Sequence, residues 1–156
     1  MKKALKAAMM ASISEVLETM FFMSLEFDPQ ITKRGATKLN SEKNLACQIG
    51  FHGEFSGYFA LLVPESLLLE LTKNFIGQDQ TAITEAHLQG TIREMLNMLA
   101  GNTLSKFNKS KEFKLDFPEL KKVTGLWNLD TESDKEITVI TETTSGYLAL
   151  RMVLDA

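Results

Sequence analysis

The segment of residues 84–109 constrains the fold most, because its pattern predicts one long helix with two different sides. Thr84 is a suitable N-cap, and Glu85 favours the positive end of a helix that begins there. A helix turns about 100° per residue, so four residues fall together on a side that we expect to face the core: Ile92, Leu96, Leu99 and Thr103.

The opposite side carries Gly90, Glu94, Asn97 and Gly101, which we call the polar stripe. A Glu and an Asn on a helix surface are usually solvated residues without a special role. Each glycine inside a helix costs about 0.5–1 kcal/mol relative to alanine, so two on one exposed stripe need a reason, such as close approach by another molecule. Met98 lies about 40° from Glu94 and is expected to be partly exposed. These residues predict a surface that binds a partner, with a plain solvated face as the alternative.

The N-terminal part of the chain alternates helical and polar patterns. Residues 3–23 predict a helix whose apolar face is formed by Met9, Ile13, Val16 and Met20. Residues 28–44 are polar and contain Pro29, Gly35 and Asn40, so they are interpreted as a loop or an irregular edge.

Strand-like runs dominate most of the remaining chain. Residues 44–53 and 55–63 predict a hairpin, and the following helix opens at Pro64 and closes at Gly77. Four further runs predict strands, and the last two are joined by a turn at residues 144–146: 112–117, 123–129, 136–143 and 146–154. The fold class is therefore α+β, with a mostly antiparallel sheet and two long helices packed on one face.

Composition excludes several classes of function. A chain of 156 residues suggests one domain, and its net charge of −3 argues against a nucleic-acid-binding protein. One cysteine and two histidines cannot form a Cys/His zinc cage within one chain. No run approaches the roughly 18 apolar residues of a membrane span, and Lys6 interrupts the weakly apolar N-terminus, so we expect a cytoplasmic protein without membrane contact.

The run REMLNMLAGN, residues 93–102, resembles the Glu-x-x-Asn…Gly signature of the chemotaxis phosphatase family that includes CheC, CheX and the phosphatase FliY. SEVLETMFFM resembles the first CheX helix, GFHGEFSGYFALLVPESLLLELTKNFIG the family's hairpin and helix, and FKLDFPELKKVTG the segment after the signature. The resemblance covers nearly the whole chain. It implies a CheC-like fold and a single CheX-like phosphatase domain over residues 1–156.

The resemblance also implies a reaction, which is hydrolysis of the phosphoaspartate on a CheY-like receiver protein. Asn97 would hold the attacking water, and Glu94 would pair with the receiver's active-site lysine. Gly90, Met98 and Gly101 would contact that partner. The Mg²⁺ would belong to the receiver, so this chain would bind no metal or cofactor of its own. CheX-like proteins are homodimers built through their sheets, which makes a homodimer the expectation here.

A second, pseudosymmetric motif is present in the CheC branch, on the first helix. The matching positions here are Ala11, Glu15, Glu18 and Phe22, where a carboxylate replaces the amide and a phenylalanine replaces the glycine. We therefore expect one active site per chain.

Two other functions stay open: a non-enzymatic docking module like the related domain of flagellar switch proteins, and a sink that binds receivers without hydrolysis. Of the other candidate residues, His52 and His87 are interpreted as surface or capping residues. Cys47 is interpreted as a buried small side chain.

Overall fold

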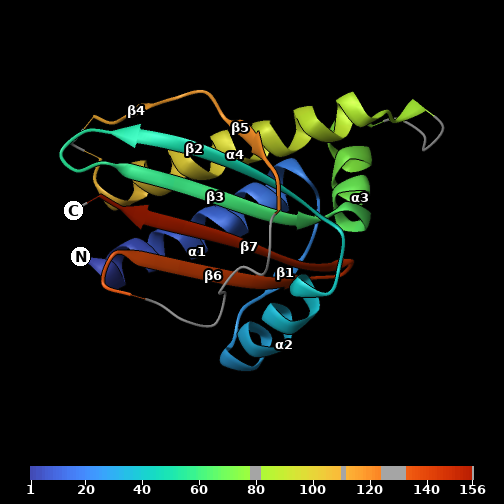
Figure 1. Cartoon of the computed structure of the whole chain (residues 1–156), viewed down its shortest axis with the longest axis horizontal. Coiled ribbons are helices and arrows are strands. Elements are labelled where there is room, and N and C mark those ends of the chain that lie inside the picture. The colour runs from blue at the N-terminus through green and yellow to red at the C-terminus, as the bar shows by residue number, and fades with distance from the viewer. Residues whose placement is uncertain (78–81, 110–111, 124–132, 156) are drawn as a thin grey trace.

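The computed structural model describes residues 1–77, 82–109, 112–123 and 133–155. Within these ranges the chain forms one antiparallel sheet in the order β1-β6-β7-β3-β2-β4, and β5 also pairs with β2 (Figure 1). The strands are β1 Leu25–Glu26, β2 Asn44–His52, β3 Gly57–Pro64, β4 Lys114–Leu115, β5 Glu119–Lys121, β6 Glu136–Thr143 and β7 Gly146–Leu154.

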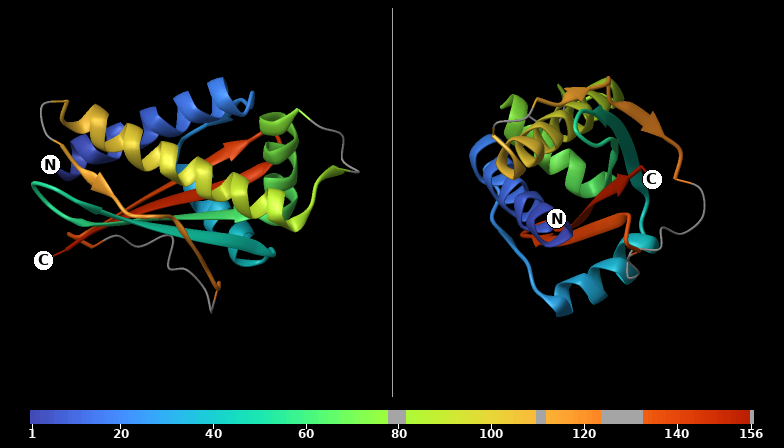
Figure 2. Two further views of the ribbon diagram at one scale, coloured as in Figure 1. Left: turned by 90° about the horizontal axis from the view of Figure 1, so that it is seen from above. Right: turned by 90° about the vertical axis from the view of Figure 1, so that its left-hand side faces the viewer.

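Helices lie on both faces of this sheet. The long helices α1 (Lys2–Met20) and α4 (Glu85–Phe107) share one face with α3 (Glu65–Ile76), and α2 (Pro29–Asn40) lies on the opposite face (Figures 1 and 2). The prediction of an α+β fold with two long helices on one face is confirmed, and α2 adds a third layer.

The sequence signals at the hairpins and helix ends are confirmed. Strands β2 and β3 pair from Asn44 opposite Pro64 to Phe51 opposite Gly57, and β6 and β7 pair up to Thr143 opposite Gly146. Gly77 closes α3 in the left-handed conformation, with φ of 67°, which a residue with a side chain rarely adopts.

The prediction of a loop over residues 28–44 is wrong, because α2 occupies residues 29–40 of that segment. The Asp28 carboxylate accepts a hydrogen bond from the Ile31 N–H at 2.8 Å, and Pro29 fits the first turn. Ile31, Ala36 and Leu39 are buried, and the last two join a small cluster formed with sheet residues. The helix thus depends on burying a narrow apolar stripe on the sheet.

Three smaller expectations also need correction. Helix α1 ends at Met20, short of the predicted residue 23, and Met20 is 41% exposed although it was placed on the apolar face. The strand predicted over residues 112–117 is limited to Lys114–Leu115. The strand predicted over residues 123–129 lies, apart from Val123, outside the described residues.

Candidate functional site

Helix α4 begins with a reciprocal cap that fixes its first turn. The His87 N–H donates to Thr84 Oγ1 at 3.3 Å, and the Thr84 N–H donates to His87 Nδ1 at 3.0 Å. The interpretation of Thr84 as the N-cap and of His87 as a capping residue is confirmed. The cap sets where the helix begins, and therefore which residues reach its outer side.

The two sides of α4 are arranged as the sequence predicts. The predicted inner side is buried in the core: Ile92, Leu96, Leu99 and Thr103. On the polar stripe, Gly90, Glu94 and Asn97 are exposed and Gly101 is half-buried. Met98 is half-buried and packs against the core cluster.

Glu94 and Asn97 are left without internal partners. Across the described ranges, neither side chain makes a hydrogen bond or an ion pair. They stand three residues apart on one helix, so they project from the same side in neighbouring turns. A carboxylate and an amide held this way can accept and donate hydrogen bonds to a molecule that approaches from outside.

Neither glycine of the polar stripe is required by packing within the described chain. A Cβ placed at Gly90 would have nothing within 4 Å, and one at Gly101 would make an ordinary contact of 3.8 Å with Leu115 Cδ1. Alanine would favour the helix by about 0.5–1 kcal/mol at each position. The bare backbone is therefore not explained by packing inside the described molecule.

Helix α1 supports α4 from one flank. Ser12 Oγ donates to the Leu99 carbonyl oxygen at 3.0 Å within the buried contact of the two helices. Lys106 Nζ lies 2.6 Å from Glu15 Oε2 and forms an ion pair across the same contact. These links hold the polar stripe on a rigid pair of helices, which lie in one layer above the sheet in Figure 2.

The corresponding positions of α1 differ from those of α4. Ala11, Glu15 and Glu18 are exposed, but Glu15 is engaged by Lys106. Phe22 does not continue the helical stripe, because α1 ends at Met20 and Phe22 has a positive φ of 54°. Its side chain is 73% exposed. No open amide or glycine is therefore presented at these positions of α1.

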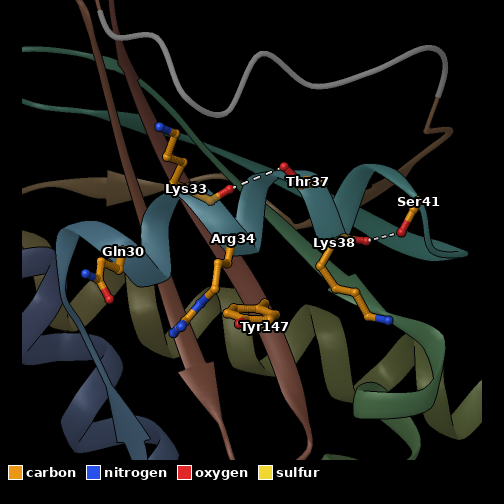
Figure 3. Close-up of a pocket in the computed structure, with 7 residues that line it drawn as sticks. All are labelled: Gln30, Lys33, Arg34, Thr37, Lys38, Ser41 and Tyr147. Atoms are coloured by element: carbon orange, nitrogen blue, oxygen red, sulfur yellow. Dashed lines mark hydrogen bonds between the residues drawn. The ribbon is translucent and has the colours of Figure 1, made fainter.

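A separate hollow of about 620 Å³ lies on the other face, along α2 (Figure 3). Lys33, Arg34 and Lys38 line it together with Tyr147 of β7. Arg34 Nη2 lies 3.7 Å from Glu142 Oε1, and Lys38 Nζ lies 3.5 Å from Glu42 Oε1. The positive charges of these two side chains are therefore already offset by acidic neighbours. The sequence pattern did not predict this hollow, because it did not predict α2. The signals available for that helix were Asp28 and Pro29 at its start and the spacing of the apolar residues Ile31 and Leu39.

Two further candidate residues have structural roles. Burial raises the pKa of the Cys47 thiol to about 11, so the side chain is an unreactive thiol at neutral pH. His52 Nε2 lies 3.0 Å from Asp116 Oδ2, an exposed pair that joins the β2–β3 hairpin to the segment after β4. The described residues contain no cluster of three or more potential metal ligands of the His, Cys, Asp or Glu type.

The family model of the chemotaxis phosphatase CheX matches residues 45–142, which include the whole of α4. The chain belongs to the CheX family. No curated protein sequence matches it. Among its described helices, none is long and apolar enough to cross a membrane.

Solved structures share the CheX fold at low sequence identity. The CheX chemotaxis protein from Vibrio vulnificus is 19% identical with a TM-score of 0.70, and the match covers 97% of this chain and 96% of that one. CheX in the CheX–CheY–BeF3–Mg²⁺ complex from Borrelia burgdorferi is 14% identical with a TM-score of 0.65, over 96% and 97% of the two chains. The FliM middle domain from Vibrio alginolyticus is 14% identical with a TM-score of 0.53, over 97% and 90%.

Proposed function

We propose that this chain hydrolyses the phosphoaspartate of a CheY-like receiver protein, in chemotaxis or a related two-component pathway, and that residues 1–156 form one CheX-like domain. The observation that carries the proposal is the polar stripe, where Glu94 and Asn97 are exposed and unpaired among the described residues. Membership of a chemotaxis phosphatase family and the solved complex of a relative with CheY support it.

The chemistry requires positioning more than strong acids or bases. Phosphoryl transfer is catalysed chiefly by alignment and charge stabilisation, and a neutral amide cannot remove a proton at pH 7. The Asn97 amide instead holds a water in line with phosphorus through hydrogen bonds. The water oxygen bonds to phosphorus as the phosphorus–oxygen bond to the aspartate breaks, which releases phosphate and restores the carboxylate.

Glu94 has a positioning role in this proposal. It pairs with the lysine of the receiver and so sets the register at which Asn97 meets the phosphoryl group. The Mg²⁺ that neutralises the phosphoryl charge is held by the receiver, so the chain supplies no metal or cofactor. Gly90, Met98 and Gly101 complete the contact surface, and bare backbone at Gly101 permits close approach.

We further propose one active site per chain and a homodimer. Glu18 stands at the position of α1 that corresponds to Asn97 of α4. Its carboxylate would repel a phosphoryl group, which supports a single site per chain. The homodimer would follow the sheet-mediated dimers of CheX-like proteins, in which a second copy would meet the edge of the sheet formed by β1 and β6. Sedimentation at several protein concentrations measures the mass of the assembly and so tests the homodimer.

The proposed substrate is a cytoplasmic signalling protein, so we also propose that this chain acts in the cytoplasm.

The decisive experiment incubates the protein with phosphorylated receivers from the same organism and follows phosphate release. Acceleration beyond the receiver's own rate supports the phosphatase. Tight binding without acceleration supports the sink or the docking module, an alternative that the fold shared with the FliM middle domain keeps open. If the protein neither bound any receiver nor accelerated the release of phosphate from one, the proposal would be contradicted.

A further inference from the structure

Arg93 immediately precedes Glu94 in α4, and the residue is exposed. Across the described ranges, its guanidinium makes no hydrogen bond and no ion pair. An exposed arginine on a helix is common and needs no explanation by itself. What distinguishes Arg93 is its place on the helix, because it lies one turn before Asn97.

The positions of Arg93, Glu94 and Asn97 around the axis of α4 follow from their spacing. Residues four apart are neighbours on a helix surface, so Arg93 adjoins Asn97. At about 100° per residue, Asn97 lies about 60° from Glu94, and Arg93 lies about 40° further in the same direction. Asn97 is therefore placed between a carboxylate on one side and a cation on the other.

Arg93 lies on the flank of α4 that is turned toward β2 and β5. Burial raises the pKa of the Cys47 thiol of β2 to about 11, and the positive charge of Arg93 opposes this shift. Cys47 is paired with Leu120 of β5. Lys106 lies about 140° from Arg93 around the axis, where it forms the ion pair with Glu15 of α1. Arg93 and Asn97 thus share the flank that faces away from α1.

The acidic residue of this flank does not neutralise Arg93. After burial, the charge of Glu119 in β5 also contributes to the raised pKa of Cys47, so this carboxylate lies on the same side of α4. Glu119 Oε2 lies 3.3 Å from Lys121 Nζ and makes no ion pair with Arg93. The Arg93 guanidinium is therefore available to an anion that approaches Asn97 from outside.

The charges that meet in the proposed complex indicate which anion this is. Glu94 brings a negative charge toward the phosphoryl group, which is itself anionic, and it draws on the positive charge of the receiver's lysine. A cation beside Asn97 offsets both effects. A guanidinium suits the task, because its planar set of N–H donors matches two phosphoryl oxygens at once.

The corresponding position on α1 carries no charge. Glu15 and Glu18 of α1 correspond to Glu94 and Asn97, so Ser14 corresponds to Arg93. Ser14 is half-buried. The helix that lacks the amide therefore also lacks the cation, and the two occur together only on α4.

We propose that Arg93 is a phosphoryl-binding residue: its guanidinium contacts the phosphoryl oxygens of the receiver while Asn97 holds the attacking water. This inference rests on the proposed function and adds one residue to the same site. Arg93 keeps its protons throughout, because a guanidinium is not deprotonated in proteins. It stabilises the charge on the phosphoryl oxygens as the bond to the aspartate breaks, which is the contribution of oriented donors and cations to phosphoryl transfer.

The test compares Arg93→Gln with the matched control Lys33→Gln. Lys33 is also an exposed cation without a partner among the described residues, but it belongs to α2, on the opposite face of the sheet. Receivers of the same organism are phosphorylated with a small phosphodonor, and phosphate release gives kcat and KM. Arg93→Gln is expected to lower kcat about 10- to 100-fold at an unchanged melting temperature. Lys33→Gln is expected to leave kcat and KM within about twofold of the parent.

The conservative variant separates charge from geometry. Arg93→Lys keeps the positive charge but loses the planar pair of donors, so it is expected to recover part of the lost kcat. A purely structural role would instead lower the melting temperature of Arg93→Gln.

The outcomes separate this inference from the proposed function. Parental kcat in a folded Arg93→Gln protein, with an active parent, would overturn the phosphoryl contact alone. A rise in KM at parental kcat that disappears at high salt would also overturn it, and would identify Arg93 as a solvated cation that steers the receiver. A parent protein that dephosphorylates no receiver would overturn the proposed function and this inference together.

Discussion

Helices α2 and α4 both contain glycine in their interior, but for different reasons. In α2, a Cβ at Gly35 would lie 2.6 Å from Ile140 Cγ2 and 2.9 Å from Tyr147 Cδ1, so the sheet occupies the space that a side chain would need. In α4, Gly90 faces open space and Gly101 has only an ordinary contact. The glycine of α2 is explained inside the molecule. Packing among the described residues does not explain those of α4, which agrees with the proposed partner surface and directs attention to the residues between them.

The largest effect that would test this contrast is the loss of activity in Asn97→Ala. The side chain is exposed and unpaired among the described residues, so its removal should leave the fold intact while the attacking water loses its position. We expect phosphate release from a phosphorylated receiver to fall by on the order of 100-fold at an unchanged melting temperature. Undiminished release by the folded variant would show that α4 does not provide the catalytic amide.

The next effect concerns the stability of α2. Gly35→Ala should lower the free energy of unfolding by about 1–3 kcal/mol, because Ile140 and Tyr147 must move to admit the methyl group. Urea denaturation of the parent and the variant measures the difference. Gly90→Ala is the matched control, and it should raise stability by about 0.5–1 kcal/mol. If both substitutions changed stability in the same direction, the contrast between the helices would be wrong.

Gly101 should separate stability from docking. Gly101→Ala should raise the free energy of unfolding by about 0.5–1 kcal/mol, because alanine favours the helix and the methyl group finds only Leu115 at 3.8 Å. Gly101→Leu should raise KM for the phosphorylated receiver more than Gly101→Ala does, by steric exclusion of the partner. Thermal melts and phosphate-release kinetics are measured on both variants. A normal melt with a parental KM for Gly101→Leu would remove Gly101 from the docking surface.

The smallest effects are expected on α1. Glu18→Ala should leave phosphate release within about twofold of the parent, because α1 presents no amide at this position. Glu15→Ala should also retain activity and should lose at most about 1 kcal/mol of stability, since its ion pair with Lys106 is largely solvated. Loss of hydrolysis in either folded variant would show that the chain has a second site on α1.

The sequence predicted α4 and its polar stripe well because the pattern is long and local. Ile92, Leu96 and Leu99 repeat with the period of the helix, and Thr84 marks its start. Helix α2 was missed because its apolar residues are few and its stability comes from the sheet beneath it. The loop-forming residues Pro29 and Gly35 therefore outweighed Ile31 and Leu39 in the sequence pattern.

The flank of the site could not be predicted from sequence for a different reason. Strands β4 and β5 have two and three residues, and each is defined only by its register against β2. No local sequence pattern predicts such a pairing, so the path of the chain between β4 and β5 depends on tertiary contacts. The resemblance to the CheX family, by contrast, was carried by a contiguous run of residues, and the family model confirms it.

The order of the strands has a consequence for how the chain folds. Strand β3 pairs with β2, its neighbour in sequence, but its other side pairs with β7, where Gly57 lies opposite Leu154. During synthesis, one edge of β3 must therefore stay open while α3, α4 and the later strands emerge. Pairings between segments so distant in sequence slow folding, and an open hydrophobic strand is a template for association. The period before β7 docks is when a nascent chain of this fold most needs protection from its neighbours.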